Sequence, residues 1–348
     1  GFYTNDGDIT FWTGSNGQTN NNSFVHIEDG INVVSALPAN QAMPNVNADF
    51  SLPSGYLTSS GGGDIVMGSG TSTDSLGPTG VLRTFSGSYM GFMYGIGGSV
   101  NTMYSGGGDI RIRAASHVSG PIGIGVRGGK NLIAGSGTIE LTVNNPSNIN
   151  SRGMELGHAA SGNVRIISSA NENPAIDIEV SNPGTTGEAG ILSGYHQNGT
   201  NNRVSIQATG LGGIVMSASN NVNSSRFGLE INGTDLLSPT GPIILDGGAK
   251  GISFMGWYSS VGFVNLGSCT TTGMPTDFNC TTSLVSSSSA DVTVRGNNIL
   301  NYGDSRYLSF RTEGNIVVEH SSGNNFTSLL NFYANTSTLV PETVRLGK

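Results

Sequence analysis

The sequence predicts an all-β fold, a single-stranded parallel β-helix or β-solenoid. Three observations support this prediction: many turn-forming residues, a recurring strand pattern and few charged side chains. Of the 348 residues, 54 are Gly, 45 are Ser and 36 are Asn, and only 11% are charged. In ordinary soluble domains roughly a quarter of the residues are charged. The composition therefore argues against helical folds and against a typical cytosolic enzyme.

A short unit recurs along the chain: a turn residue, a β-branched residue, a variable residue and another apolar residue. Its β-branched positions are Ile9, Ile65, Ile110, Ile139, Val164, Val204, Ile243, Val292, Ile316 and Val344. Alternation of this kind predicts strands with one buried face. The copies lie between 24 and 56 residues apart, an irregular spacing that suits insertions at turns.

A second strand-like unit, led by glycine, falls between many of these copies. It begins at Gly123, Gly153, Gly190, Gly228 and Gly262. Each turn of the coil should therefore hold two or three short strands, with about 20 to 27 residues per turn and about 13 to 17 turns in all. Glycine-rich stretches at 61–63 and 106–108 are interpreted as corners, because glycine tolerates the positive φ that sharp corners need.

Stacked parallel strands also account for the scarcity of charge. Strands pair about 4.8 Å apart, and at that spacing repeated like charges repel by roughly 0.9 kcal/mol each even in water. Asn, Ser and Thr can instead form hydrogen bonds from one turn to the next. We expect one elongated β-solenoid over 1–348, with loop insertions near 36–62 and 266–290.

The competing fold is an antiparallel β-sandwich or jelly roll, which also has many short strands. Such folds favour tight Asn-Gly hairpins. Asn16-Gly17, Asn198-Gly199 and Asn232-Gly233 occur, but within longer polar stretches. The parallel coil is the better prediction.

Charge and hydropathy exclude two classes of partner. The net charge is −8 and the 15 basic residues are scattered, so no nucleic-acid partner is predicted. No apolar run approaches the roughly 20 residues that span a bilayer, so no membrane insertion is expected. The chain starts with Gly1 rather than Met, and we interpret it as a processed or excised piece.

Few residues suggest a chemical site. Cys269 and Cys280 are separated by ten residues rich in Thr, Gly and Pro, a spacing that suits a small local disulfide, with buried free thiols as the alternative. The five histidines lack metal-ligand spacing, so no cofactor is predicted. Trp12, Trp257 and Tyr258 could contact a ligand by stacking on sugars, or could belong to the core or cap an end.

The segments Gly7–Trp12, Gly62–Met67 and Gly107–Ile112, with their Gly-Asp-Ile motif, resemble the repeats of filamentous-haemagglutinin-type adhesins, which bacteria export by two-partner secretion. The resemblance implies a right-handed β-helix at the bacterial cell surface, with adhesion or structure as its role and no catalysis. Host-surface or matrix glycans and proteins would be its partners. The family's Asn-Pro-Asn-Gly-Ile motif is approached only by 145–149, which lacks the Gly.

Two other functions compete with the adhesin. Strand patterns run from Ile9 to Val344 and leave edges that invite pairing, so the chain could be a subunit of an extracellular filament or sheath, with identical subunits end to end. A β-helical polysaccharide-degrading enzyme would need two nearby carboxylates. Asp177 with Glu179, Glu188 or Glu230 could supply them, but a solvated surface is the simpler interpretation.

Overall fold

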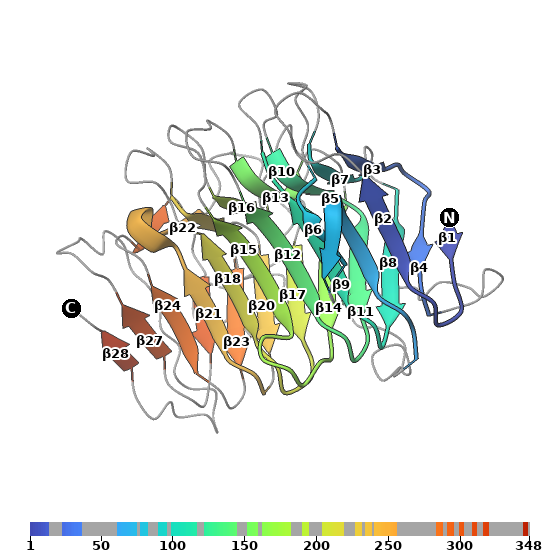
Figure 1. Ribbon diagram of the computed structural model, residues 1–348. Helices are drawn as coiled ribbons and strands as arrows, with labels where there is room; N and C mark the ends of the chain where they lie inside the picture. The colour runs from blue at the N-terminus through green and yellow to red at the C-terminus, as the bar shows by residue number, and fades with distance from the viewer. Residues whose placement is uncertain are drawn as a thin grey trace.

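The computed structural model of the chain is a parallel β-helix built from three long sheets, with the two termini at opposite ends of the stack (Figure 1). Among the described strands, only β6 pairs antiparallel with its neighbour, β5. The predicted all-β parallel coil is confirmed, and the antiparallel sandwich is wrong. The structure describes residues 1–13, 23–36, 61–74, 77–82, 90–95, 99–116, 122–144, 152–158, 162–181, 190–194, 204–218, 227–231, 234–238, 240–255, 283–287, 291–295, 299–302, 308–311, 316–319 and 344–346.

The chain visits the three sheets in rotation. The nine-stranded sheet contains β1 (Phe2–Tyr3), β4 (Val33–Val34), β8 (Asn101–Gly106), β11 (Lys130–Ala134), β14 (Val164–Ser168), β17 (Val204–Ala208), β20 (Thr234–Ser238), β23 (Ser283–Ser287) and β26 (Leu308–Arg311). The eight-stranded sheet contains β3 (Val25–Ile27), β7 (Phe92–Tyr94), β10 (Ile122–Arg127), β13 (Arg152–His158), β16 (Ile191–Ser193), β19 (Leu229–Ile231), β22 (Ile252–Met255) and β25 (Ile299–Tyr302).

The eleven-stranded sheet positions most of the residues discussed below. It contains β2 (Ile9–Thr13), β5 (Ile65–Asp74), β6 (Gly77–Gly80), β9 (Ile110–Ala114), β12 (Ile139–Asn144), β15 (Ile176–Ser181), β18 (Ile214–Ala218), β21 (Ile243–Asp246), β24 (Val292–Arg295), β27 (Ile316–Glu319) and β28 (Val344–Leu346). The one helix in the described part of the chain is the short 3-10 helix η1 (Gly248–Lys250), and no helix there is long and apolar enough to cross a bilayer.

An unbroken column of β-branched residues in register runs along the eleven-stranded sheet. Each member is the in-register partner of the next, in the order Ile9, Ile65, Ile110, Ile139, Ile176, Ile214, Ile243, Val292, Ile316 and Val344. The members from Ile65 to Ile243 are fully buried. Branched side chains pack well on a pleated sheet, and burying each one contributes about 1.5–3 kcal/mol.

Polar side chains form rung-to-rung hydrogen bonds on the nine-stranded sheet, as the composition predicts. Thr102, Asn131 and Arg165 are in-register partners on β8, β11 and β14. Asn131 Nδ2 donates to Thr102 Oγ1 at 3.2 Å, and Arg165 Nη1 donates to Asn131 Oδ1 at 3.3 Å. Buried polar groups of this kind need such partners.

The two predicted loop insertions are only partly described. Most of 36–62 lies outside the described residues. Within 266–290, the described segment Ser283–Ser287 is strand β23, which pairs with β20 and β26. This segment belongs to the nine-stranded sheet rather than to a loop. Its sequence, SLVSS, has two adjacent apolar residues and no apolar alternation, so the strand does not stand out in the sequence.

Candidate functional site

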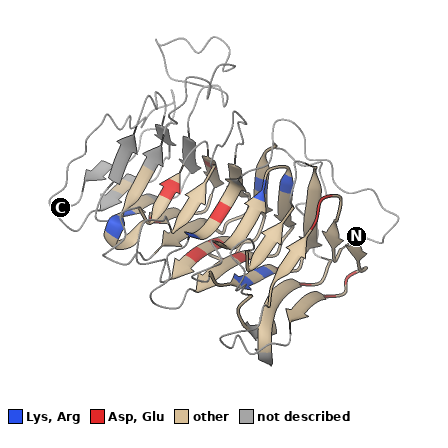
Figure 2. Cartoon of the chain, turned by 90° about the horizontal axis from the view of Figure 1, so that it is seen from above, with Lys and Arg blue, Asp and Glu red and all other residues tan. Residues whose placement is uncertain are grey.

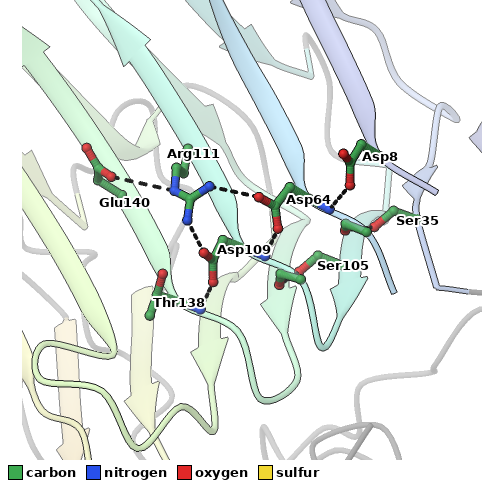
Figure 3. Close-up of polar contacts among 10 residues, drawn as sticks. Asp8, Ser35, Asp64, Ser105, Asp109, Arg111, Thr138 and Glu140 are labelled. Carbon is green, nitrogen blue, oxygen red and sulfur yellow. Dashed lines mark hydrogen bonds and ion pairs between the residues drawn. The ribbon is translucent and has the colours of Figure 1, made fainter. Parts of the chain in front are cut away.

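Aspartates close the corners through which the first turns enter the eleven-stranded sheet. Asp8 Oδ1 accepts a hydrogen bond from the backbone N–H of Asp64 at 2.9 Å (Figure 3). Asp64 Oδ1 accepts one from the N–H of Asp109 at 2.9 Å, and Asp109 Oδ1 accepts one from the N–H of Thr138 at 2.6 Å. Each carboxylate therefore satisfies a backbone donor of the following turn with a charge-assisted bond.

The glycines before Asp64 and Asp109 are required by the close approach of stacked backbones. A Cβ on Gly63 would lie 2.4 Å from the backbone carbon of Gly7, and one on Gly108 would lie 2.3 Å from the Gly63 carbonyl oxygen. The next corner repeats the contact, because a Cβ on Gly137 would lie 2.0 Å from the Gly108 carbonyl oxygen. The prediction that 61–63 and 106–108 form corners is confirmed.

Arg111 gathers carboxylates from three successive turns on the outer face of the same sheet. Its Nη1 donates to Asp64 Oδ2 at 2.8 Å, its Nη2 donates to Asp109, and its Nε lies 3.9 Å from Glu140 Oε2 (Figure 3). The Arg111 side chain is only 11% exposed. The planar guanidinium has five donors in a fixed fork, which suits it to several acceptors at once. Sequence reasoning missed this residue, although its place two residues after Asp109 on a strand puts both on one face.

Three acidic side chains follow along the outer face. Figure 2 shows how sparse charged residues are elsewhere on the described strands. Glu140 on β12 is the in-register partner of Asp177 on β15, and Glu179 lies two residues further along β15 on the same face. Burial, followed by the charges of Glu179 and Glu140, raises the pKa of Asp177 to about 6. A carboxyl group with such a pKa can hold a proton near neutral pH, as a general acid must.

The other carboxylates predicted to accompany Asp177 are not brought to it. Glu230 lies on β19 of the eight-stranded sheet and is 1% exposed. Glu188 lies outside the described residues. Within the part of the chain that the structure describes, no group of three or more His, Cys, Asp or Glu side chains is arranged to hold a metal ion.

Trp12 lies on the outer face of β2, at the N-terminal end of the eleven-stranded sheet, and is 48% exposed. Its indole Nε1 donates a hydrogen bond to the carbonyl oxygen of Gly70 in the next turn at 2.6 Å. Its in-register partner on β5 is Gly68, which has no side chain to cover the ring. The ring is therefore held by its polar edge while much of its apolar surface faces solvent.

Two further exposed aromatic residues belong to the first turn. Phe2 is 49% exposed and packs edge-on against Phe11, with ring centroids 5.0 Å apart. Phe24 is 38% exposed and lies against His26, with ring centroids 4.7 Å apart. The ring nitrogen Nε2 of His26 lies 3.1 Å from the Met90 carbonyl oxygen, and burial lowers the pKa of this histidine.

The remaining predicted site residues lie outside the described residues. They are Trp257, Tyr258, Cys269 and Cys280. The local disulfide and the second aromatic pair stay predictions.

Comparison of the chain with protein-family models, with curated proteins and with solved structures finds no match. The resemblance to filamentous-haemagglutinin-type adhesins therefore stays a prediction. The features that bear on function are the exposed aromatic side chains of the first turn and the acidic residues on the outer face of the eleven-stranded sheet.

Proposed function

We propose that the chain is a secreted or cell-surface β-helix that serves adhesion or structure and has no catalytic activity. The observation that carries this proposal is the aliphatic column from Ile9 to Val344, in which every member pairs in register with the next. A stack of in-register turns is stiff along its axis and contacts only its neighbouring turns. Such a rod holds surface features at fixed heights, which is the mechanical requirement of an adhesive or structural stalk.

The composition suggests where such a rod works. A chain rich in Ser and Asn, with only three lysines, suits contact with neutral, hydroxyl-rich partners. We place the chain outside the cell, at a bacterial surface, and name host-surface or matrix glycans and proteins as its partners. This assignment agrees with the adhesin repeats that its Gly-Asp-Ile segments resemble.

Binding of the folded chain to an array of glycans and matrix proteins tests the adhesive role. Collagen, fibronectin, laminin and a panel of neutral and anionic oligosaccharides are suitable probes. We expect saturable binding to at least one of them, and loss of that binding in Ile139→Asp, which buries a charge in the core. Thr142→Ala, on the outer face of the same strand, is the matched control. Absence of saturable binding to every probe would overturn the adhesive role.

A second candidate is a subunit of a filament or sheath in which identical chains stack end to end. Among the described strands, β1, β2 and β3 stand at one end of the three sheets, and exposed strand edges are templates for pairing. The alternate residues Val344 and Leu346 of β28 are apolar, as are Ile9 and Phe11 of β2. Electron microscopy separates the candidates: continuous fibres favour the filament subunit, and isolated rods favour the adhesin.

A third candidate is a polysaccharide-degrading enzyme, favoured by one observation. Asp177 has a raised pKa and lies beside Glu140 on the neighbouring strand, and glycoside hydrolysis needs two carboxylates about 5–10 Å apart. Release of reducing ends from polysaccharides, measured for the wild type and for Asp177→Asn, tests it. Cleavage that disappears in Asp177→Asn would overturn the non-catalytic proposal.

A further inference from the structure

We propose that Trp12 is the stacking platform of a binding site for neutral oligosaccharides. The proposal deepens the adhesive function and rests on it, because it names the ligand class and the residue that contacts it. The ring of Trp12 is exposed and is also held in a fixed orientation. Val100 and Leu211 are exposed too, but they have no planar ring.

The orientation is fixed by the bond from indole Nε1 to the Gly70 carbonyl oxygen, at 2.6 Å. This bond satisfies the only polar atom of the side chain. What remains for a ligand is the apolar ring surface, which is already positioned and loses little conformational freedom on binding.

The β5–β6 hairpin forms a wall beside the ring. Gly68 is the in-register neighbour of Trp12, and a Cβ placed on Gly68 would lie 3.1 Å from both the Cβ and the carbonyl oxygen of Pro78. β6 therefore lies directly over Gly68, one strand away from the indole. A flat ring next to a raised wall gives a ligand one surface to stack on and one edge to lie against.

The neighbourhood selects for neutral hydroxyl-rich ligands. β2 has the sequence ITFWT and β6 the sequence GPTG, with no charged residue in either. Thr10 is exposed two residues before Trp12 and therefore lies on the same face. A pyranose with equatorial substituents has a flat C–H face that matches an indole, and its rim of hydroxyl groups suits threonine. Anionic sugars would meet a chain of net charge −8.

A second copy of the chain is the weaker occupant of this surface. End-to-end stacking would use the backbone edge of β2, the first strand of the eleven-stranded sheet among the described residues. The indole lies on the outer face of the same strand rather than along that edge. A sugar can therefore bind to Trp12 both in a single chain and in chains stacked end to end.

Tryptophan fluorescence tests the proposal, because the chain has only two tryptophans. In a Trp257→Phe background Trp12 is the sole reporter. We expect a saturable change in its emission with at least one of the neutral sugars cellohexaose, chitohexaose and maltohexaose, and little change with a heparin hexasaccharide. Calorimetric titration of the same sugars should show a loss of affinity of at least tenfold in Trp12→Ala and in Trp12→Leu, because leucine is apolar but not flat. Trp12→Phe should retain more of the affinity.

Phe24→Ala is the matched control, since it removes another exposed aromatic side chain of the first turn and should leave the affinity unchanged. Circular dichroism and the melting temperature of each variant show whether it is folded, and a folded Trp12→Leu or Trp12→Phe suffices for the test if Trp12→Ala is not. No saturable signal with any neutral sugar, a response to heparin alone, or unchanged affinity in Trp12→Leu would overturn the proposal. Array binding that survives in Trp12→Leu would leave the adhesive function standing while removing Trp12 from it.

Discussion

Glu140 and Asp177 are in-register partners on β12 and β15, so two carboxyl groups face solvent side by side on adjacent strands of the eleven-stranded sheet. Adjacent strands lie about 4.8 Å apart, and like charges at that spacing disfavour the ionised state of one partner. Arg111, one strand before Glu140, offsets part of the negative charge from the other side, with its Nε 3.9 Å from Glu140 Oε2. Burial, followed by the charges of Glu179 and Glu140, raises the pKa of Asp177 to about 6.

The first prediction concerns pH. The pKa of Asp177 is raised to about 6 in the folded chain, against about 3.9 in an unfolded chain. The folded state therefore binds more protons between these values, and its stability should increase as pH falls from 7.5 to 5. Because Asp177 is partly exposed, solvent screening limits the rise in melting temperature to about 1–2 °C.

Asp177→Asn should remove this dependence and raise the melting temperature at pH 7.5. Glu172→Gln, at an exposed position of the corner before β15, is the matched control and should leave the pH profile unchanged. Two results together would contradict the assignment: a wild type that is less stable at pH 5 than at pH 7.5, and an Asp177→Asn variant whose melting temperature depends on pH in the same way as that of the wild type.

The second prediction concerns the glycines of the corners. Gly108→Ala should destabilise the chain by about 1–3 kcal/mol or more, because the added methyl would lie 2.3 Å from the Gly63 carbonyl oxygen. Gly7→Ala is a matched control from the first turn, where the nearest atom to the added methyl is Thr4 Cβ at 3.5 Å. Urea unfolding of both variants measures the difference. Equal midpoints for the two variants would show that the stacked backbones do not set the choice of glycine.

The third prediction separates the two roles of Asp64. Its Oδ1 accepts the Asp109 N–H and its Oδ2 accepts from Arg111. Asp64→Asn keeps an acceptor oxygen, whereas Asp64→Ala removes both bonds and should cost about 1–3 kcal/mol of unfolding free energy. The asparagine variant should lose less than the alanine variant. Identical losses in chemical unfolding would mean that the backbone bond contributes nothing measurable.

The fourth prediction concerns the aliphatic column. Ile139 is fully buried, and Ile139→Ala should cost about 2–5 kcal/mol because it leaves a cavity between two turns. Thr142→Ala on the same strand faces outward and should cost less than about 1 kcal/mol. Hydrogen exchange of backbone amides in β9, β12 and β15 locates the effect. Protection that falls equally in both variants would contradict the assigned inward face of β12.

Apolar alternation indicates a strand and turn residues indicate a corner, each within a few neighbouring residues. The parallel coil could therefore be predicted from the recurrence of these local patterns. Eight of the ten recurring units lie on the eleven-stranded sheet, and the glycine-led units at Gly123, Gly153, Gly190 and Gly228 lie at or just before strands of the eight-stranded sheet. Val164 and Val204 instead belong to β14 and β17 of the nine-stranded sheet. Their alternation is the same, and only the pairing register distinguishes the sheets.

The number of turns and the charged site were beyond sequence reasoning. The main path of the eleven-stranded sheet has ten strands in the described residues, fewer than the expected 13 to 17 turns. In-register partners such as Ile139 and Ile176 are 37 residues apart, which is longer than the assumed repeat because loop length leaves no periodic signal. The contact of Arg111 with Asp64 could not be predicted without the register of the strands, because 47 residues separate the two in the sequence.

The glycine corners also decide where the chain tolerates new sequence. At the corner between β11 and β12, a methyl group on Gly137 already meets the backbone of the turn before it, so an added peptide there would separate the two layers. Foreign sequence inserted after Gly137 is therefore expected to unfold the neighbouring turns, so a display scaffold made from this chain would have to carry its epitopes at another corner.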